Sequence, residues 1–291
     1  MSQTYPWEKA ISLSFFTEPD ETAHGLESAT LSRIYNHGFR SVELSFSHHN
    51  YYDVFALHTE CGVQECLKKV DAAGLRVWSL HLPYGEELDL SNPALSSECP
   101  AAMEKVLDSD KRLLWTCAAL GGRVAVIHSS YEPIPKEERS LRLETAGRHL
   151  RVLSDYAKGL GLCLAVENLP RTCLGNCSDE MLELLHASDA SFQFDTNHSL
   201  LENNEQFLSK MLQAGYCPVS LHISDYDFVN ERHDLPGHGV NHWNKLLDML
   251  LKAGYQGPAL YEIRHIVNKD RIVSLDEMAE NIDLLLQGQL G

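Results

Sequence analysis

The chain alternates short apolar runs with longer segments whose apolar residues recur every three or four positions. The short runs predict strands at Ile11–Phe16, Ser41–Phe46, Arg76–Pro83, Arg123–Ser130, Cys163–Pro170, Phe192–His198, Pro218–Asp225 and Gly257–His265. The segments between them predict helices at Leu26–Asn36, Val63–Ala73, Ala101–Ala119, Lys136–Gly159, Ser178–Ala187, Asn203–Ala214, His242–Ala253 and Leu275–Leu286. Strand and helix therefore alternate along the whole chain.

Eight strand–helix units predict an α/β protein, a single (β/α)8 TIM barrel that forms one domain over residues 1–291. Glycines follow several of the helices, such as Gly74, Gly215 and Gly254, and suit left-handed C-caps in short loops before the next strand. A doubly wound open sheet is the alternative fold. It is disfavoured because no glycine-rich phosphate loop follows the first predicted strand.

Four of the later strands end in a residue that can bind a divalent cation: Glu167 in LAVENLP, Asp195 in FQFDTNH, His222 in VSLHISD and Glu262 in ALYEIRH. A charged group at the end of a buried strand is costly unless it is paired or binds a metal. Because the carboxyl ends of barrel strands meet at one rim, these residues predict a common site. Such an oxygen-rich set suits Mn²⁺, Mg²⁺ or Co²⁺ and accepts Zn²⁺, so the metal type stays open.

Each of these four residues also has a structural alternative when it is taken alone. Glu167 or Asp195 could cap the following helix, and His222 could be an ordinary core histidine. Glu262 could pair with Arg264. Four separate coincidences at strand ends would be needed to explain the whole set in this way, so a metal site is the favoured interpretation.

Further ligand-type residues end the other strands or follow them closely. They either orient ligands and substrate hydroxyls or bind a second or third metal. These residues are Glu43, His81, His128, His198, Glu231, His233 and His238.

Composition and charge restrict the partners of the chain. A hydrophobic fraction of 44% supports a large core, and 24 basic against 41 acidic residues give a formal net charge of −17. Such a charge repels phosphate backbones and anionic membranes, so we expect no nucleic-acid partner and no membrane association. The N-terminus lacks a secretory pattern, no apolar stretch is long enough to span a membrane, and a cytoplasmic protein is expected.

Five short motifs give the chain a resemblance to a known family: VEN (166–168), DTNH (195–198), LHISD (221–225), LPGHG (235–239) and YEI (261–263). From about Ser41 to about Arg264 the chain resembles the xylose isomerase-like TIM barrels. This family includes sugar and sugar-phosphate isomerases, ketose 3-epimerases and apurinic endonucleases of the endonuclease IV type. The resemblance implies that Glu167, Asp195, His222 and Glu262 hold one divalent metal.

In the endonuclease branch of this family the resemblance implies a cluster of three zinc ions. Its ligand positions match His81, His128, Glu167, Asp195, His198, His222, Glu231, His233 and Glu262. This chain departs from the endonuclease motif at Glu231, where the motif has aspartate. The longer glutamate side chain argues against binding of the third zinc ion.

The leading functional hypothesis is a metal-dependent isomerase or epimerase of a small sugar, sugar phosphate or related polyol ketone, which reacts through an enediolate. The resemblance implies that Glu167 and Glu262 act as acid and base on opposite sides of this small-molecule carbohydrate substrate. His198 and Arg264 would bind substrate hydroxyls, or a phosphate in the case of Arg264. Barrels of this family often pair, so a homodimer is expected.

Two other functions remain as alternatives. One is a zinc-dependent phosphodiesterase or apurinic endonuclease with two or three metals, although the acidic loop sequences GEELDLSNPALSSE and DYDFVNE do not suit a DNA backbone. The other is a catalytically silent barrel that binds a metal or a metabolite. Specificity is expected to depend on the loops that contain Tyr84, Tyr131, Arg171 and Trp243.

Overall fold

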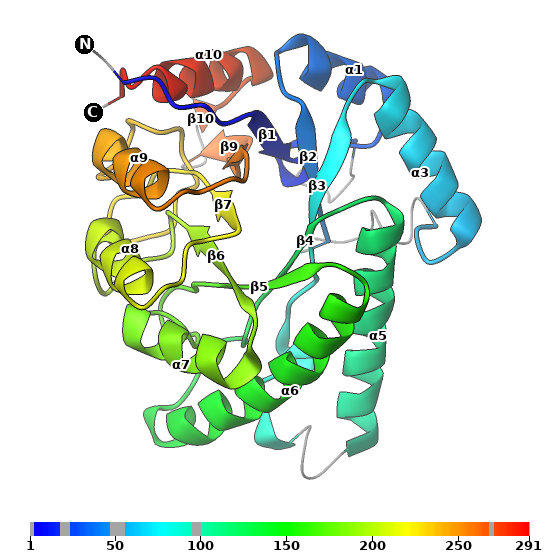
Figure 1. Ribbon diagram of the computed structural model, residues 1–291, viewed down its shortest axis with the longest axis vertical. Helices are drawn as coiled ribbons and strands as arrows, with labels where there is room; N and C mark the ends of the chain where they lie inside the picture. The colour runs from blue at the N-terminus through cyan, green and yellow to red at the C-terminus, as the bar shows by residue number, and fades with distance from the viewer. Residues whose placement is uncertain (1–2, 18–23, 47–55, 95–99, 268–270, 291) are drawn as a thin grey trace.

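The computed structural model describes residues 3–17, 24–46, 56–94, 100–267 and 271–290, and it shows a ring of parallel strands surrounded by helices (Figure 1). The eight-stranded sheet has the order β7-β6-β5-β4-β3-β2-β1-β8. Its strands are β1 (Lys9–Ser12), β2 (Ser41–Ser45), β3 (Arg76–His81), β4 (Val124–Ile127), β5 (Cys163–Glu167), β6 (Ser191–Asp195), β7 (Ser220–His222) and β8 (Ala259–Tyr261). A parallel bridge between Ile223 and Tyr261 joins the two ends of the sheet. The predicted (β/α)8 barrel is confirmed.

The helices cover the outside of the ring in chain order (Figure 1). They are α1 (Ser28–Asn36), α3 (Glu60–Ala72), α5 (Pro100–Ala119), α6 (Arg139–Gly159), α7 (Ser178–Ser188), α8 (Asn204–Gln213), α9 (Trp243–Lys252) and α10 (Leu275–Leu286). Each predicted helix has a counterpart within a few residues. Within the described ranges, no helix is both long enough and apolar enough to cross a membrane.

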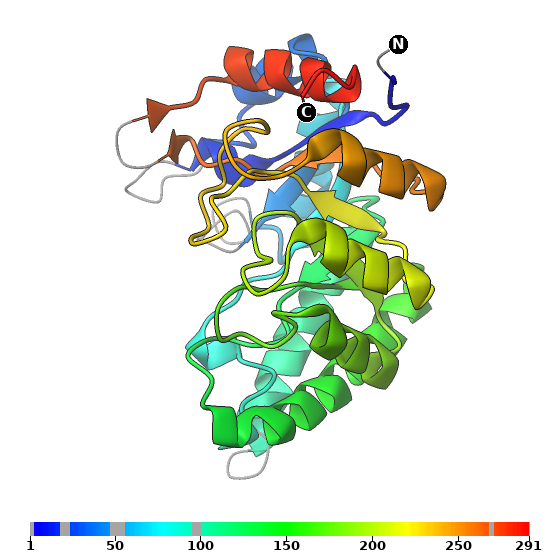
Figure 2. The ribbon, with the colours of Figure 1, turned by 90° about the vertical axis from the view of Figure 1, so that its left-hand side faces the viewer.

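Two local features differ from the prediction. The first strand ends at Ser12, and Leu13–Phe16 forms a 3₁₀ helix that buries Leu13 and Phe15. Periodicity alone cannot tell a short apolar run in a strand from one in a helical turn. A small antiparallel hairpin, β9 (Ile266–Val267) with β10 (Arg271–Ile272), was not predicted because its strands are only two residues long. It projects on the same side of the barrel as the loop after β7 (Figure 2).

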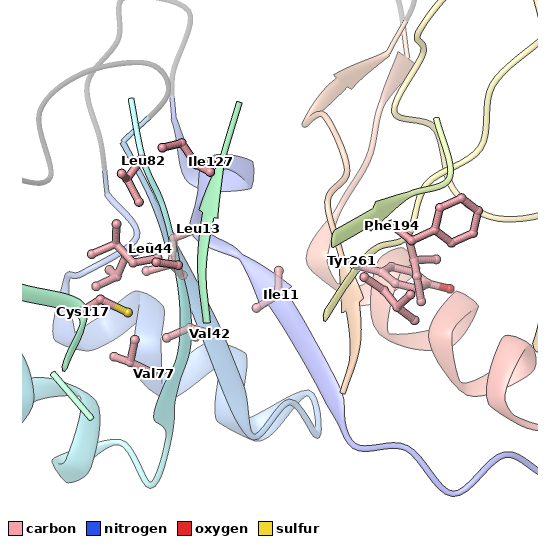
Figure 3. Packing of buried hydrophobic residues seen from close by; sticks show 14 of the residues in the cluster. Ile11, Leu13, Val42, Leu44, Val77, Leu82, Cys117, Ile127, Phe194 and Tyr261 are labelled. Carbon is pink, nitrogen blue, oxygen red and sulfur yellow. The ribbon is translucent and has the colours of Figure 1, made fainter. Parts of the chain in front are cut away.

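The main apolar core lies between the strands and the helices. Val42 and Leu44 of β2 pack there with Val77, Leu82 and, from α5, Cys117 (Figure 3). Because side chains alternate along a strand, the residue between Val42 and Leu44 faces the inside of the barrel. That residue is Glu43, which is fully buried.

A β-bulge in β3 adjusts the side chains that face the barrel interior. Val42 pairs with Val77, but Glu43 pairs with Ser79, so Trp78 is the extra residue. Trp78 donates a hydrogen bond across the barrel to Ser220 Oγ (3.1 Å), and Ser79 Oγ donates to Glu43 Oε2 (2.7 Å). Bulges redirect side chains beside functional sites. Here the bulge places a donor against the buried carboxylate of Glu43.

Candidate metal centre

The carboxyl ends of the strands open into a pocket of about 470 Å³. In barrels of this type the active site lies at this end. The pocket wall contains most of the ligand-type residues predicted from the sequence: His81, His128, Glu167, His198, Glu231, His233 and Glu262.

The four strand-end residues converge on one point. One ligand atom from each of Glu167, Asp195, His222 and Glu262 lies within 4.8 Å of the others. His222 Nδ1 is 2.6 Å from Glu167 Oε1, 3.7 Å from Asp195 Oδ2 and 3.3 Å from Glu262 Oε2. The buried Asp195 Oδ2 has no hydrogen-bond partner in the described part of the chain. An orphaned carboxylate oxygen among three other potential ligands fits a divalent cation.

Glu43 fixes the orientation of the His222 ring. The Nε2 atom of His222 lies 3.1 Å from Glu43 Oε1, and the other ring nitrogen faces the ligand group. A histidine that donates one N–H to a carboxylate presents the lone pair of its other nitrogen to a metal. This contact is compatible with the orienting role, which is one of the two predicted interpretations of Glu43.

A second group shares Glu167 with the first. The Nε2 atoms of His81 and His128 lie 3.1 and 3.0 Å from the same oxygen, Glu167 Oε2. The Nδ1 atom of His81 can donate to the carbonyl oxygen of Leu82 (2.8 Å), so a neutral His81 directs a lone pair at the carboxylate. Two acceptors approach this closely only when a proton or a cation lies between them. This group also fits a metal ion.

A third group consists of His198, Glu231 and His233. His198 Nδ1 is 2.9 Å from the carbonyl oxygen of Asn168, which leaves Nε2 for a ligand. His233 has a left-handed backbone (φ 47°). Glu231 forms an ion pair with Arg171, so its charge is already partly compensated.

The VEN and DTNH motifs hold the ligands in place through their asparagines. The Asn168 side chain donates to the carbonyl oxygen of Asp195 and accepts from its N–H, both at 2.8 Å. Asn197 Oδ1 accepts from the N–H groups of Arg232 and His233, both at 3.0 Å. The two asparagines therefore connect β5, β6 and the loop after β7 into one rigid support.

Besides the candidate ligand His222, the LHISD motif contains Asp225, which supports the loop after β7 together with the LPGHG motif. The Asp225 carboxylate accepts from the N–H of Gly237 (2.9 Å), the N–H of Asn241 (3.2 Å) and Trp243 Nε1 (3.0 Å). A Cβ at Gly239 would overlap the carbonyl oxygen of Tyr226 and the Asp225 carboxylate. Glycine is therefore required at position 239 to close this loop, which carries Glu231 and His233.

The buried charges shift one another's pKa values. Desolvation opposes the charge of Glu167, but the positive His222 and hydrogen bonds from His128 and His222 hold its pKa well below the usual range. Desolvation also opposes the charge of His222, yet the carboxylates of Glu262, Glu43 and Glu167 raise its pKa well above the usual value. For Glu262, desolvation raises the pKa to about 7, with further repulsion from Asp195 and Glu167. Glu262 is therefore a weaker acid than Glu167.

Several of the structural alternatives for single residues do not hold in the structure. Neither Glu167 nor Asp195 caps a helix, since the residues before α7 and α8 are Cys177 and Asn203. In the described part of the chain Arg264 forms no ion pair with Glu262, and it lines the pocket instead.

Two further residues lie outside the pocket wall. His238 is near Asp234 and belongs to none of the three groups. Trp243 is buried against Asp225 and lines no part of the pocket, whereas Tyr84, Tyr131 and Arg171 do. The sequence did not reveal Asn197 and Asp225 as supports, because their partners lie 12 to 36 residues away.

The fold and these groups define a (β/α)8 barrel with a pocket of carboxylates and imidazoles at the end where barrel enzymes carry their active sites. The chain belongs to the xylose isomerase-like TIM barrel family, whose model matches residues 31–286. No curated protein sequence matches the chain.

Solved structures share this barrel at low sequence identity. The structure of a D-tagatose 3-epimerase-like protein has a TM-score of 0.74 and 19% identity, over 96% of this chain and 95% of that chain. A 3-keto-D-glucoside 4-epimerase from E. coli has a TM-score of 0.71 and 17% identity, over 96% and 99% of the two chains. D-psicose 3-epimerase from Clostridium cellulolyticum H10 has a TM-score of 0.71 and 17% identity, over 97% and 96%. These similarities establish the fold.

Proposed function

We propose that this protein is a metal-dependent isomerase or epimerase of a small sugar, sugar phosphate or related polyol ketone. The observation that carries the proposal is the group of Glu167, Asp195, His222 and Glu262, with its orphaned Asp195 oxygen, in a pocket of about 470 Å³. A pocket of that volume suits a small ligand. The titles of the similar structures name sugar epimerases, which supports the same class of substrate.

A divalent ion in this group would polarise the substrate carbonyl and stabilise the negative charge that develops on its oxygen. The protein must then move a proton to and from the adjacent carbon. Glu262 suits this role because its side chain is 16% exposed to the pocket and its pKa of about 7 lies near neutral pH. Glu167 is the proposed second acid–base group, although its contacts with three histidines leave it less free.

The test is isotope exchange with purified protein, supplied with Mn²⁺, Co²⁺ or Zn²⁺ and a panel of ketoses and ketose phosphates in D₂O. Wild type should incorporate deuterium at the carbon next to the carbonyl, and Glu262→Gln and Glu167→Gln should each abolish turnover with the fold intact. Glu280→Gln, an exposed change on α10, is the control. Undiminished exchange in both active-site variants would exclude the two-base scheme.

A second candidate function is phosphoester hydrolysis with two or three zinc ions. The specific observation in its favour is that two further groups, His81–His128–Glu167 and His198–Glu231–His233, flank the first. Clustered metals can activate a water and stabilise a leaving oxygen. The net charge of −17 disfavours a nucleic-acid substrate. Three zinc ions per chain by elemental analysis, together with cleavage of an abasic oligonucleotide, would favour the hydrolase over the isomerase.

A further inference from the structure

A small cavity lies beside the His81–His128–Glu167 group. Residues after β3 and β4 line it together with Asp110 of α5, and the shared lining residues Tyr84, His128 and Ser130 connect it to the main pocket. The space open to the centre of a water-sized sphere is about 10 Å³. That is room for roughly one water molecule, provided that polar groups face it.

Asp110 is an anomaly in the apolar stripe of its helix. The neighbours of Asp110 on the buried face of α5 include Val106, Leu113 and Leu114, which pack in the core. Asp110 is only 4% exposed, and within the described ranges no residue forms a hydrogen bond or ion pair with it. Desolvation alone therefore raises the pKa of its carboxyl group to about 7. A buried carboxyl group without a donor is costly, so a partner in the adjoining cavity is expected.

The histidines of the candidate metal groups share a pattern with one exception. In four of the five histidines, the ring nitrogen that faces away from the ligands has an acceptor within 3.3 Å. These acceptors are Leu82 O for His81, Asn168 O for His198, Glu43 for His222 and Glu262 O for His233. In His128 the Nε2 atom faces Glu167, and Nδ1 has no partner among the described residues. Tyr84 stacks on the His128 ring with centroids 4.1 Å apart, which fixes the plane of the ring but not its protonation.

We propose that one water molecule occupies this cavity and bridges the carboxylate of Asp110 and Nδ1 of His128. When His128 Nε2 binds a cation, its Nδ1–H donates to the water and the water donates to Asp110. Asp110 is then a positioning residue that acts on His128 as Glu43 acts on His222. The water is required because no direct hydrogen bond or ion pair joins Asp110 to His128.

The first test is a high-resolution crystal structure of the wild-type protein. The expected result is one ordered water within hydrogen-bond distance of both Asp110 and His128 Nδ1. An empty cavity, or a water that contacts only one of the two groups, overturns the proposal. This readout needs no metal and no substrate, so its failure is distinct from a failure of the proposed function.

The second test measures zinc affinity by competition with a chelator, and it rests on the metal centre of the proposed function. Asp110→Leu restores the apolar stripe of α5 and should fold, but it should weaken binding at the His81–His128–Glu167 group by about 10- to 100-fold. Asp110→Asn, which keeps an acceptor, should lose less. Asp108→Asn, a change of an exposed carboxylate on the same helix, should leave affinity unchanged. Equal affinity of wild type and Asp110→Leu overturns the proposal.

Discussion

Binding of a divalent ion to the four-residue group should release protons, because the metal-free group holds a proton on His222. His222 lies between two carboxylates, with Nδ1 2.6 Å from Glu167 Oε1 and Nε2 3.1 Å from Glu43 Oε1. Desolvation alone would lower the pKa of His222, but Glu262, Glu43 and Glu167 raise it well above the usual value. An ion that binds Nδ1 must displace the proton there.

The size of the effect follows from the number of protons displaced. One proton per ion makes the affinity rise tenfold for each pH unit below the pKa of His222, or about 1.4 kcal/mol per unit. Glu262, with its pKa raised to about 7, holds a further proton below that pH. A plot of the logarithm of the affinity against pH should therefore have a slope of between about one and two protons per ion near pH 6. The slope should approach about one near pH 8. Affinity increases with pH in both ranges.

Calorimetric titration with Mn²⁺ or Zn²⁺ in two buffers of different ionisation enthalpy measures the protons released directly. Glu43→Gln removes one of the charges that raise the pKa of His222, so this variant should release fewer protons and show a weaker pH dependence. Glu280→Gln, which is remote and exposed, should behave like wild type. Affinity that does not change with pH, with no proton release near pH 6, would refute the reasoning.

Two further predictions concern the loops around the pocket. Gly239→Ala should lower the free energy of unfolding by about 1–3 kcal/mol in urea denaturation, because the added Cβ overlaps Tyr226 and Asp225. The control is Gly159→Ala, where nothing lies within 4 Å of the added Cβ. Equal losses of stability in the two variants would contradict the steric argument. Arg171→Gln should raise zinc affinity at the His198–Glu231–His233 group up to about fivefold, because Glu231 is released from its ion pair with Arg171. Unchanged or weaker zinc binding would show that Arg171 does not compete with zinc for Glu231.

The residues that line the pocket could be found in the sequence because the fold brings the ends of parallel strands together. Glu167, Asp195 and His222 each end a strand in the structure, and Glu262 directly follows β8. Once eight strand–helix units are recognised, the position of a residue at a strand end predicts its neighbours. The approach of His81 and His128 to Glu167 follows from the same rule.

Features that depend on packing between distant elements could not be found in this way. The bulge at Trp78, which aligns Ser79 with Glu43, leaves no signature in the apolar pattern. Trp243 was expected in one of the loops that determine specificity, but Asp225 accepts a hydrogen bond from its indole N–H in the interior. Asp110 interrupts the apolar face of α5. Only the packing of α5 against β4 shows that Asp110 and His128 line the same cavity.

Glu167 is the residue on which the two proposed chemistries diverge. Its Oε1 faces His222 and its Oε2 faces both His81 and His128, whereas a general base needs one oxygen directed at the substrate. If a second ion occupies the His81–His128–Glu167 group, Oε2 becomes a ligand and Glu167 can no longer carry a proton. Glu262 then remains as the proton carrier, which permits transfer along one face of an enediolate but not inversion at carbon by two opposed bases. Under the proposed two-base scheme, epimerisation therefore requires that no second ion is bound to Glu167 Oε2.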